Sequence, residues 1–154
     1  MTGRRLGLIA ALGSLGMMIA ALGFQYIGEL PPCKMCYWQR YPHIAAIGIG
    51  VLFLLFAYRG FLLLGALSAL TTGVIGVYHV GVEEKWWQGP DTCTSSSTDG
   101  LSVDQLLDQI MTAPLVRCDE IAWSLMGISM AGWNAIVSFA LAFLWVTAFS
   151  RFKA

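Results

Sequence analysis

Two cysteines separated by two residues, Cys33 and Cys36, are the first feature of this sequence that could do chemistry. The segment that holds them reads PPCKMCYWQR, and apolar sequence flanks it on both sides. A CxxC pair can cycle between dithiol and disulfide, bind a metal ion, attach a haem or close a small structural loop. The rest of the chain is needed to choose among these uses.

Three of these uses fit the sequence poorly. Covalent haem attachment requires a histidine directly after the second cysteine, and Tyr37 stands there. A four-cysteine zinc site usually combines two close pairs, whereas the other cysteines, Cys93 and Cys118, are widely spaced. We therefore predict no metal ligands. A CxxC disulfide closes so small a loop that it constrains the unfolded chain little, so a redox pair is favoured and structural disulfides are the main alternative.

Arg40 follows Cys36 closely and supports the redox interpretation. If residues 36–40 are helical, Arg40 lies one turn from Cys36 on the same face, and its charge favours the thiolate form that attacks disulfides and electrophiles. Pro42 leaves two possibilities open: it begins a helix, which places Arg40 before it, or it lies inside a helix that began earlier. An arginine that reaches toward lipid headgroups is the alternative role.

The elements that must position these residues are membrane helices. The chain has 154 residues, of which 57% are hydrophobic and 12% charged, and its mean hydropathy is +0.69. Soluble domains carry about 25% charged residues, so a soluble helical bundle is disfavoured. Uncharged stretches long enough to span a bilayer occupy residues 6–27, 41–58, 61–82 and 131–149. We predict one integral membrane domain over residues 1–154, an all-α bundle of four transmembrane helices.

The distribution of charge predicts the orientation of this bundle. If both termini are cytoplasmic, the short inside segments carry only basic charges, at Arg4, Arg5, Arg59, Arg151 and Lys153. Every acidic residue falls in the outer loops, 28–40 and 83–130, and the density of basic residues favours this orientation. All four cysteines then face the oxidising periplasm of a bacterial inner membrane, where disulfides persist. The formal net charge of zero gives no indication of a nucleic-acid partner.

The second outer loop contains two recognisable segments. The tract TCTSSSTDG around Cys93 is rich in small polar residues and is predicted to be flexible. Residues 102–111 begin with a capping-box pattern, Ser102 and Gln105, and continue with apolar residues at helical spacing. We predict a short amphipathic helix that lies on the membrane or packs on the bundle and positions Cys118 over the first loop.

This combination of features resembles one family of membrane enzymes. A short four-span protein with C-x-x-C-x-x-x-R in its first outer loop and two spaced cysteines in its second is similar to the disulfide bond formation protein B (DsbB) family. The matching stretch reads CKMCYWQRYPH, and the resemblance extends over nearly the whole chain. It implies a thiol:quinone oxidoreductase that reoxidises a periplasmic thioredoxin-fold oxidase of the DsbA type. The electrons would pass to ubiquinone or menaquinone.

The resemblance also implies a role for each cysteine and for Arg40. Cys93 matches the cysteine that forms the mixed disulfide with the partner, and Cys118 matches its mate, which attacks Cys33 and links the two loops. Cys36, released as a thiolate, then engages the quinone ring, and Arg40 matches the arginine beside the quinone. Electrons step between two pairs only where the loops meet, because exchange needs a thiolate in line with a disulfide.

Two histidines and a tryptophan lie near the predicted outer ends of the spans. His79 resembles the histidine that the family associates with quinone, and a titratable residue within a span is a functional candidate. A hydrogen bond to a backbone carbonyl is its alternative role. His43 is predicted to be interfacial, with quinone contact as the lesser option. Trp38 fits an interfacial aromatic belt and could also line a quinone pocket.

Two other functions are considered beside this one. A vitamin-K-epoxide-reductase-like enzyme shares the bundle and the chemistry, but its CxxC lies near the fourth span rather than in the first loop. A non-catalytic membrane protein with structural disulfides or a metal site is the alternative from a different class. Thiol reactivity separates these functions, because catalytic disulfides accumulate as thiols without quinone whereas structural disulfides stay oxidised.

Overall fold

Four long helices make up most of the computed structural model, which describes residues 2–91, 93–94, 102–104, 107, 111 and 116–152. The helices are α1 (Gly3–Tyr26), α2 (Lys34–Phe56), α3 (Gly60–Glu83) and α5 (Met130–Arg151). All four are long and apolar enough to cross a membrane, and the predicted four-helix membrane bundle is confirmed. The amphipathic helix predicted over residues 102–111 falls largely outside the described residues.

The start of α2 differs most from the sequence prediction. The uncharged stretch begins at residue 41, but the helix begins at Lys34, with Cys33 as its N-cap residue. The Cys33 sulfur accepts a hydrogen bond from the backbone N–H of Cys36, which satisfies one of the N–H groups that a helix start leaves unpaired. Pro42 therefore lies inside the helix, and Arg40 is a helical residue one turn from Cys36.

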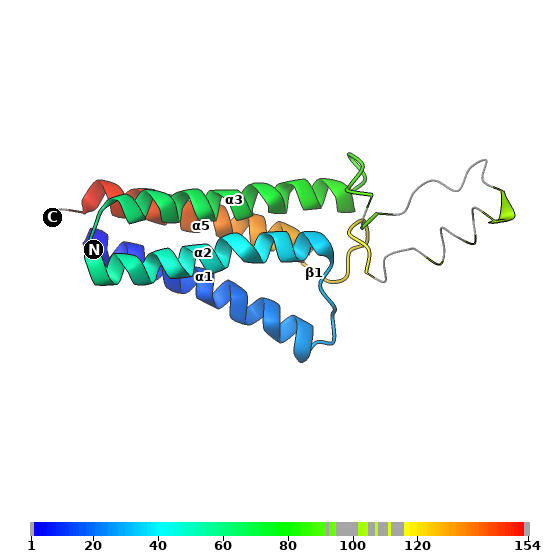
Figure 1. The fold of residues 1–154 in the computed structure, drawn as a ribbon, viewed down its shortest axis with the longest axis horizontal. Coiled ribbons are helices and arrows are strands. Elements are labelled where there is room, and N and C mark those ends of the chain that lie inside the picture. Colours follow the sequence, from blue (N-terminus) through cyan, green and yellow to red (C-terminus); the bar gives the residue numbers. More distant parts are fainter. Residues whose placement is uncertain are drawn as a thin grey trace.

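The bundle has two different ends (Figure 1). Both chain termini lie at one end, and the loops that carry the cysteines lie at the other. α3 packs against α2 and α5, and α1 packs against α2 and α5. Toward the cysteine end α1 leans away from the other helices (Figure 1), so the two ends of the bundle are packed differently.

The terminal end is held together by close contacts between small and large residues. Trp145 of α5 is fully buried against α3, where a Cβ atom at Gly65 would lie 2.6 Å from the indole ring. A Cβ atom at Gly7 of α1 would likewise lie 2.7 Å from the Leu62 side chain. Small residues let transmembrane helices approach closely enough for extensive van der Waals contact. This end therefore forms the tightly packed core of the protein.

A short β-hairpin leads the second loop back into the bundle. β1 (Ser124–Leu125) and β2 (Ile128–Ser129) pair in antiparallel fashion, a local element that the all-α prediction lacked. Met126 and Gly127 both have positive φ, 54° and 78°, as a tight two-residue turn requires. Ser129 then caps α5 by accepting a hydrogen bond from the backbone N–H of Gly132. The hairpin thus fixes the start of α5 next to the cysteine loops.

Candidate active site

All four cysteines lie in the cysteine end of the bundle. Cys93 and Cys118 form a disulfide, whereas Cys33 and Cys36 are free and their Sγ atoms lie 2.9 Å apart. Cys33, Cys93 and Cys118 are 5%, 1% and 0% exposed, and all three belong to one buried cluster. Cys36 packs against the same cluster. The two outer loops therefore meet at their cysteines, which is the arrangement that an electron relay needs.

The segment around Cys118 is fixed by polar contacts. Its backbone N–H donates to the carbonyl of Cys93 at 2.7 Å. Arg117 donates to both carboxylate oxygens of Asp119, at 2.7 and 3.0 Å, and pairs with Glu120 at 3.0 Å. The hydrogen bond from Arg117 is the main cause that holds the pKa of Asp119 below its usual range. These contacts keep the second loop in place above the CxxC pair.

The two sulfurs of the CxxC pair are not equivalent. Cys33 donates a hydrogen bond to Cys36 Sγ, and this bond together with burial raises the pKa of the Cys33 thiol. Cys36 is less buried than Cys33 and lies one helical turn before Arg40. Cys33 therefore keeps its proton more readily, and Cys36 is the better placed of the two to attack an electrophile.

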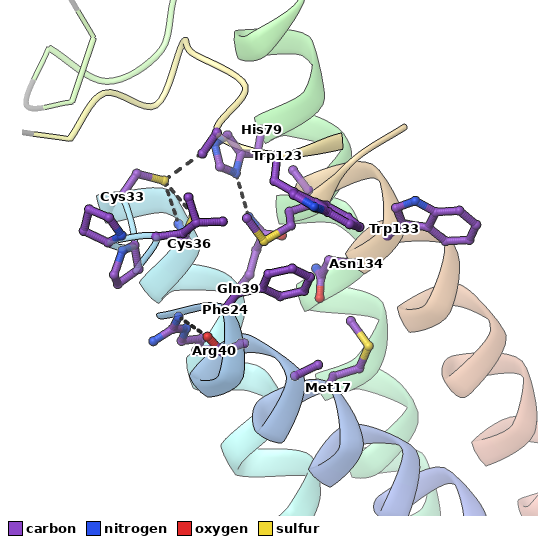
Figure 2. Close-up of a pocket in the computed structure, with 18 of the residues that line it drawn as sticks. Met17, Phe24, Cys33, Cys36, Gln39, Arg40, His79, Trp123, Trp133 and Asn134 are labelled. Atoms are coloured by element: carbon purple, nitrogen blue, oxygen red, sulfur yellow. Dashed lines mark hydrogen bonds between the residues drawn. The ribbon is translucent and has the colours of Figure 1, made fainter. Parts of the chain in front are cut away.

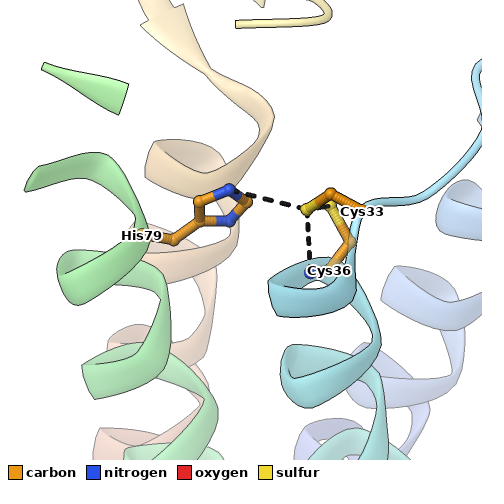
Figure 3. A group of neighbouring side chains, drawn as sticks. All are labelled: Cys33, Cys36 and His79. Carbon is orange, nitrogen blue, oxygen red and sulfur yellow. Dashed lines mark hydrogen bonds between the residues drawn. The ribbon is translucent and has the colours of Figure 1, made fainter. Parts of the chain in front are cut away.

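His79 of α3 points at the CxxC pair (Figure 3). Its Nε2 atom lies 3.7 Å from Cys33 Sγ, and the side chain is buried. On the other side of the ring, Nδ1 lies 2.8 Å from the amide nitrogen of Gln39, which also contacts the carbonyl of Met35. Because an amide nitrogen is only a donor, Nδ1 is the acceptor and the neutral ring carries its proton on Nε2, toward Cys33.

A chain of buried polar groups continues from Gln39 into the bundle. The Thr72 hydroxyl donates to the backbone carbonyl of Gln39 at 2.9 Å and accepts from Asn134 at 3.2 Å. The Asn134 side-chain oxygen lies 2.9 Å from His43 Nε2. Sequence reasoning missed Gln39, Thr72 and Asn134, although polar residues inside apolar helices are a signal of such contacts.

His43 corrects one prediction. It was expected at the membrane interface, but only 2% of its surface is exposed and it lies between α2 and α5. The reason is the early start of α2, which places His43 in the third turn rather than at the helix start. Its Nδ1 atom is buried and has no hydrogen-bond partner among the described residues.

The Arg40 side chain extends from α2 to α1, where it is held by hydrogen bonds. Its guanidinium donates to the Gln25 side-chain oxygen at 2.6 Å and to the carbonyl of Ala21 at 3.2 Å, and it lies 5.3 Å from the Tyr37 ring centre. No carboxylate partner of Arg40 is found among the described residues. Its charge is thus placed beside Cys36 and at the edge of the space between α1 and α2.

A cavity of about 340 Å³ occupies that space. Its walls are mostly apolar, with Met17 and Phe24 from α1 and Trp123 from the segment before the hairpin, whereas Trp133 and Asn134 line it from α5 (Figure 2). Its polar lining residues are Cys33, Cys36, Gln39, Arg40, His43, His79, Glu83, Arg117, Glu120 and Asn134. Trp38, a predicted candidate for this lining, is not part of it and lies exposed on α2.

The cavity has the size and composition of a small-molecule site. Cavities of roughly 300–1,000 Å³ with apolar walls and a few polar groups are typical of such sites. Among the described residues, Cys33, Cys36 and His79 also form a group whose possible metal-binding atoms all lie within 4.8 Å of one another. The prediction of no metal ligands considered the four cysteines alone, whereas this group includes a histidine from a different helix.

Comparison with known proteins shows which family the sequence matches. Residues 3–148 match the family model described as disulfide bond formation protein DsbB. A disulfide bond formation protein B from Dechloromonas aromatica is 31% identical over 135 residues, which cover 82% of this chain and 79% of that protein. One from Verminephrobacter eiseniae is 31% identical over 150 residues, 91% of this chain and 81% of that protein. No solved structure gives a significant match.

Proposed function

The chain belongs to the disulfide bond formation protein B family of disulfide-forming oxidoreductases, and we propose that it oxidises a periplasmic DsbA-type protein and passes the electrons to a membrane quinone. The observation that carries the proposal is the apolar cavity beside the free CxxC pair. A quinone ring is flat, lipid-soluble and electrophilic, so it suits apolar walls with a thiol at one side. The vitamin-K-epoxide-reductase-like alternative is set aside, because the CxxC caps α2 and the family model covers the chain.

The first half of the proposed reaction moves two electrons from the partner to the CxxC pair by disulfide exchange. One thiolate of the partner attacks the Cys93–Cys118 disulfide at Cys93 and releases Cys118, which attacks Cys33 in an oxidised CxxC pair and releases Cys36. The second thiol of the partner then attacks the mixed disulfide with Cys93, which releases Cys93 and leaves the partner oxidised. Cys93 attacks the Cys33–Cys118 bond, which restores its own disulfide and leaves Cys33 and Cys36 as a dithiol. The common buried cluster of Cys33, Cys93 and Cys118 supports these transfers.

The second half reoxidises the CxxC pair. A bound quinone, ubiquinone or menaquinone, would accept two electrons and two protons as the dithiol becomes a disulfide. Cys36 lines the cavity and would act as the nucleophile toward the quinone ring, and Cys33, whose sulfur lies 2.9 Å away, would then close the disulfide. Arg40, fixed by Gln25 and Ala21, places a positive charge at the cavity edge and stabilises negative charge that develops there. The Nε2 proton of His79 stabilises negative charge on the Cys33 sulfur.

The proposed orientation places the cysteine end in the periplasm and both termini in the cytoplasm. Both termini lie at the end of the bundle opposite the cysteine loops (Figure 1), which supports a common side for each group. The basic residues Arg4, Arg5 and Arg59 lie near the terminal end, as the positive-inside rule expects of a cytoplasmic side. Labelling of single exposed cysteines with a membrane-impermeant reagent in intact cells tests this orientation.

The decisive experiment uses the purified full-length protein with its bound quinone. A reduced DsbA-type protein is added, and quinone absorbance and partner thiols are followed together for the wild type and Cys36→Ser. We expect the wild type to form one partner disulfide for each quinone reduced, and Cys36→Ser to leave the quinone unchanged. If the wild type consumes no thiols and reduces no quinone with a range of partners, the proposed function is wrong.

A further inference from the structure

Cys33, Cys36 and His79 direct three metal-binding atoms from two helices toward one point (Figure 3). Cys33 Sγ lies 2.9 Å from Cys36 Sγ and 3.7 Å from His79 Nε2. In a tetrahedral zinc site, bond lengths of about 2.3 Å to sulfur and about 2.0 Å to nitrogen separate neighbouring ligand atoms by roughly 3.5–3.8 Å. The sulfur–nitrogen distance already fits, and the two sulfurs need to separate by less than about 1 Å.

The three ligands are held by the fold rather than by a mobile loop. Cys33 is the N-cap of α2, and the backbone N–H of Cys36 donates to its sulfur at 3.2 Å. This N–H donor also stabilises the sulfur once the metal displaces the thiol proton and the thiolate forms. Cys33 and His79 are 5% and 3% exposed, so neither has to lose much freedom when an ion binds. The ion can reach them through the cavity that all three residues line.

Glu83 is the nearest candidate for a fourth ligand, outside the group of three atoms, and Gln39 supports the histidine. Glu83 lies one turn after His79, and its Oε1 atom is 3.9 Å from His79 Nε2. Its carboxylate accepts a hydrogen bond from Ser129, which orients it. Binding of a metal through Nε2 leaves the ring proton on Nδ1, where the Gln39 side-chain oxygen can accept it once that amide turns over. A metal-bound histidine usually has such a partner for its second nitrogen.

We propose that the dithiol form of this protein binds Zn²⁺ through Cys33, Cys36 and His79, and that the Glu83 side chain moves toward the ion as the fourth ligand. Binding releases the two thiol protons and changes no oxidation state. The disulfide form does not bind the ion, because a disulfide sulfur lacks the thiolate charge that holds zinc. The site is thus open only while the CxxC pair is reduced, and a bound ion prevents the oxidation of that pair. The last consequence rests on the proposed function, whereas the binding itself does not.

The binding test uses the full-length protein in detergent micelles, reduced and then freed of reductant, and titrated with Co²⁺ alone. We expect one Co²⁺ per chain, with the visible bands of tetrahedral cobalt and a sulfur-to-cobalt charge-transfer band, both removed by added Zn²⁺. The same protein oxidised with diamide is expected to show neither band. Because this control needs no substitution, it cannot be confused with misfolding. Equal bands in the oxidised and reduced protein would overturn the proposal.

Single substitutions then locate the site. Cys33→Ser, Cys36→Ser and His79→Ala are expected to weaken Co²⁺ binding at least about tenfold, and Glu83→Gln to weaken it less. Cys93→Ser and Cys118→Ser are the matched controls, and both are expected to keep the bands. Bands that survive in Cys36→Ser and disappear in Cys93→Ser would place the ion elsewhere and refute the assignment.

A turnover measurement separates this proposal from the proposed function. Zn²⁺ added to wild-type protein that is oxidising a reduced partner is expected to slow quinone reduction, and a chelator is expected to restore it. Zinc binding without any effect on turnover would overturn the inhibitory part of the proposal. Co²⁺ binding by a protein that reduces no quinone, with or without zinc, would support the metal site and refute the proposed function.

Discussion

Thr71 and Thr72 are neighbours on α3, but their hydroxyl groups lie in different surroundings. Thr72 is fully buried, donates to the Gln39 carbonyl of α2 at 2.9 Å and accepts from Asn134 of α5 at 3.2 Å. Thr71 is exposed on the outer surface of the bundle and donates only to the Leu67 carbonyl of its own helix, at 2.8 Å. The pair therefore separates a hydrogen bond between helices from one within a helix.

We predict that Thr72→Val lowers the free energy of unfolding by about 1.2 kcal/mol. Hydrogen bonds between transmembrane helices contribute about 0.6 kcal/mol each on average, and this substitution removes two while keeping the side-chain shape. Thr71→Val removes no contact between helices, so its effect is expected to stay within about 0.5 kcal/mol. The difference between the two variants isolates the contribution of the buried hydroxyl.

The assay is equilibrium unfolding of the purified protein in mixed micelles with increasing SDS, followed by far-ultraviolet circular dichroism. A double-mutant cycle of Thr72→Val with Asn134→Leu is expected to give a coupling energy of about 0.6 kcal/mol. Equal effects of the two threonine variants would refute the assignment of the buried network as a stabilising contact. A coupling energy of zero would remove the Thr72–Asn134 bond from that network.

The remaining predictions concern packing, the cavity edge and the second loop. Gly65→Val places atoms against the Trp145 ring and is expected to cost about 1–3 kcal/mol in the same unfolding assay, whereas Gly16→Ala, which meets nothing within 4 Å, is expected to change little. In steady-state kinetics, Arg40→Met is expected to raise the KM for a short-chain quinone by about tenfold or more, since charged hydrogen bonds contribute about 1.5–3 kcal/mol. The KM of Arg40→Lys is expected to lie between those of the wild type and Arg40→Met. Arg117 lowers the pKa of Asp119, so this ion pair stabilises the loop at pH values above the usual carboxyl pKa. The stabilisation is lost as the pH falls through the lowered pKa, and an acid-active protease is therefore expected to cleave the loop faster on acidification. Asp119→Asn is expected to remove this pH dependence.

The four-helix bundle could be predicted because the bilayer constrains both length and composition of a spanning helix. The start of α2 could not be read in the same way. Arg40 ends the uncharged stretch, yet the helix extends back through Arg40 and Gln39 to Lys34. Arg40 bonds to Gln25 of α1 and Gln39 to His79 of α3, so neither polar group has to face lipid. The first charged residue therefore shows where the lipid-facing apolar surface ends. The start of the helix depends instead on the hydrogen bond that the Cys33 sulfur accepts.

The candidate site was predicted in part, by residue type. Cys33, Cys36, Arg40 and His79 were singled out from the sequence, and all four line one cavity. Gln39 and Asn134 were missed because an amide in an apolar helix indicates a buried contact but not its partner. Their partners lie on other helices, and the contacts depend on the rotation of each helix about its axis, which a single sequence leaves undetermined.

The terminal end of the bundle is closely packed and stabilises the fold, whereas the cysteine end contains the candidate active site. At the terminal end, Gly65 brings α3 within van der Waals distance of Trp145, and a cavity there would cost contacts that lipid cannot replace. At the cysteine end, α1 leans away and is held by directed contacts instead, from Arg40 to Gln25 and from Phe24 to Trp123, whose ring centres are 4.8 Å apart. Since these few contacts span the cavity, loosening them widens the site while the packed end stays intact. A Phe24→Ala substitution therefore affects the affinity of the cavity for its ligand more than it affects unfolding, and the reverse holds for Gly65→Val.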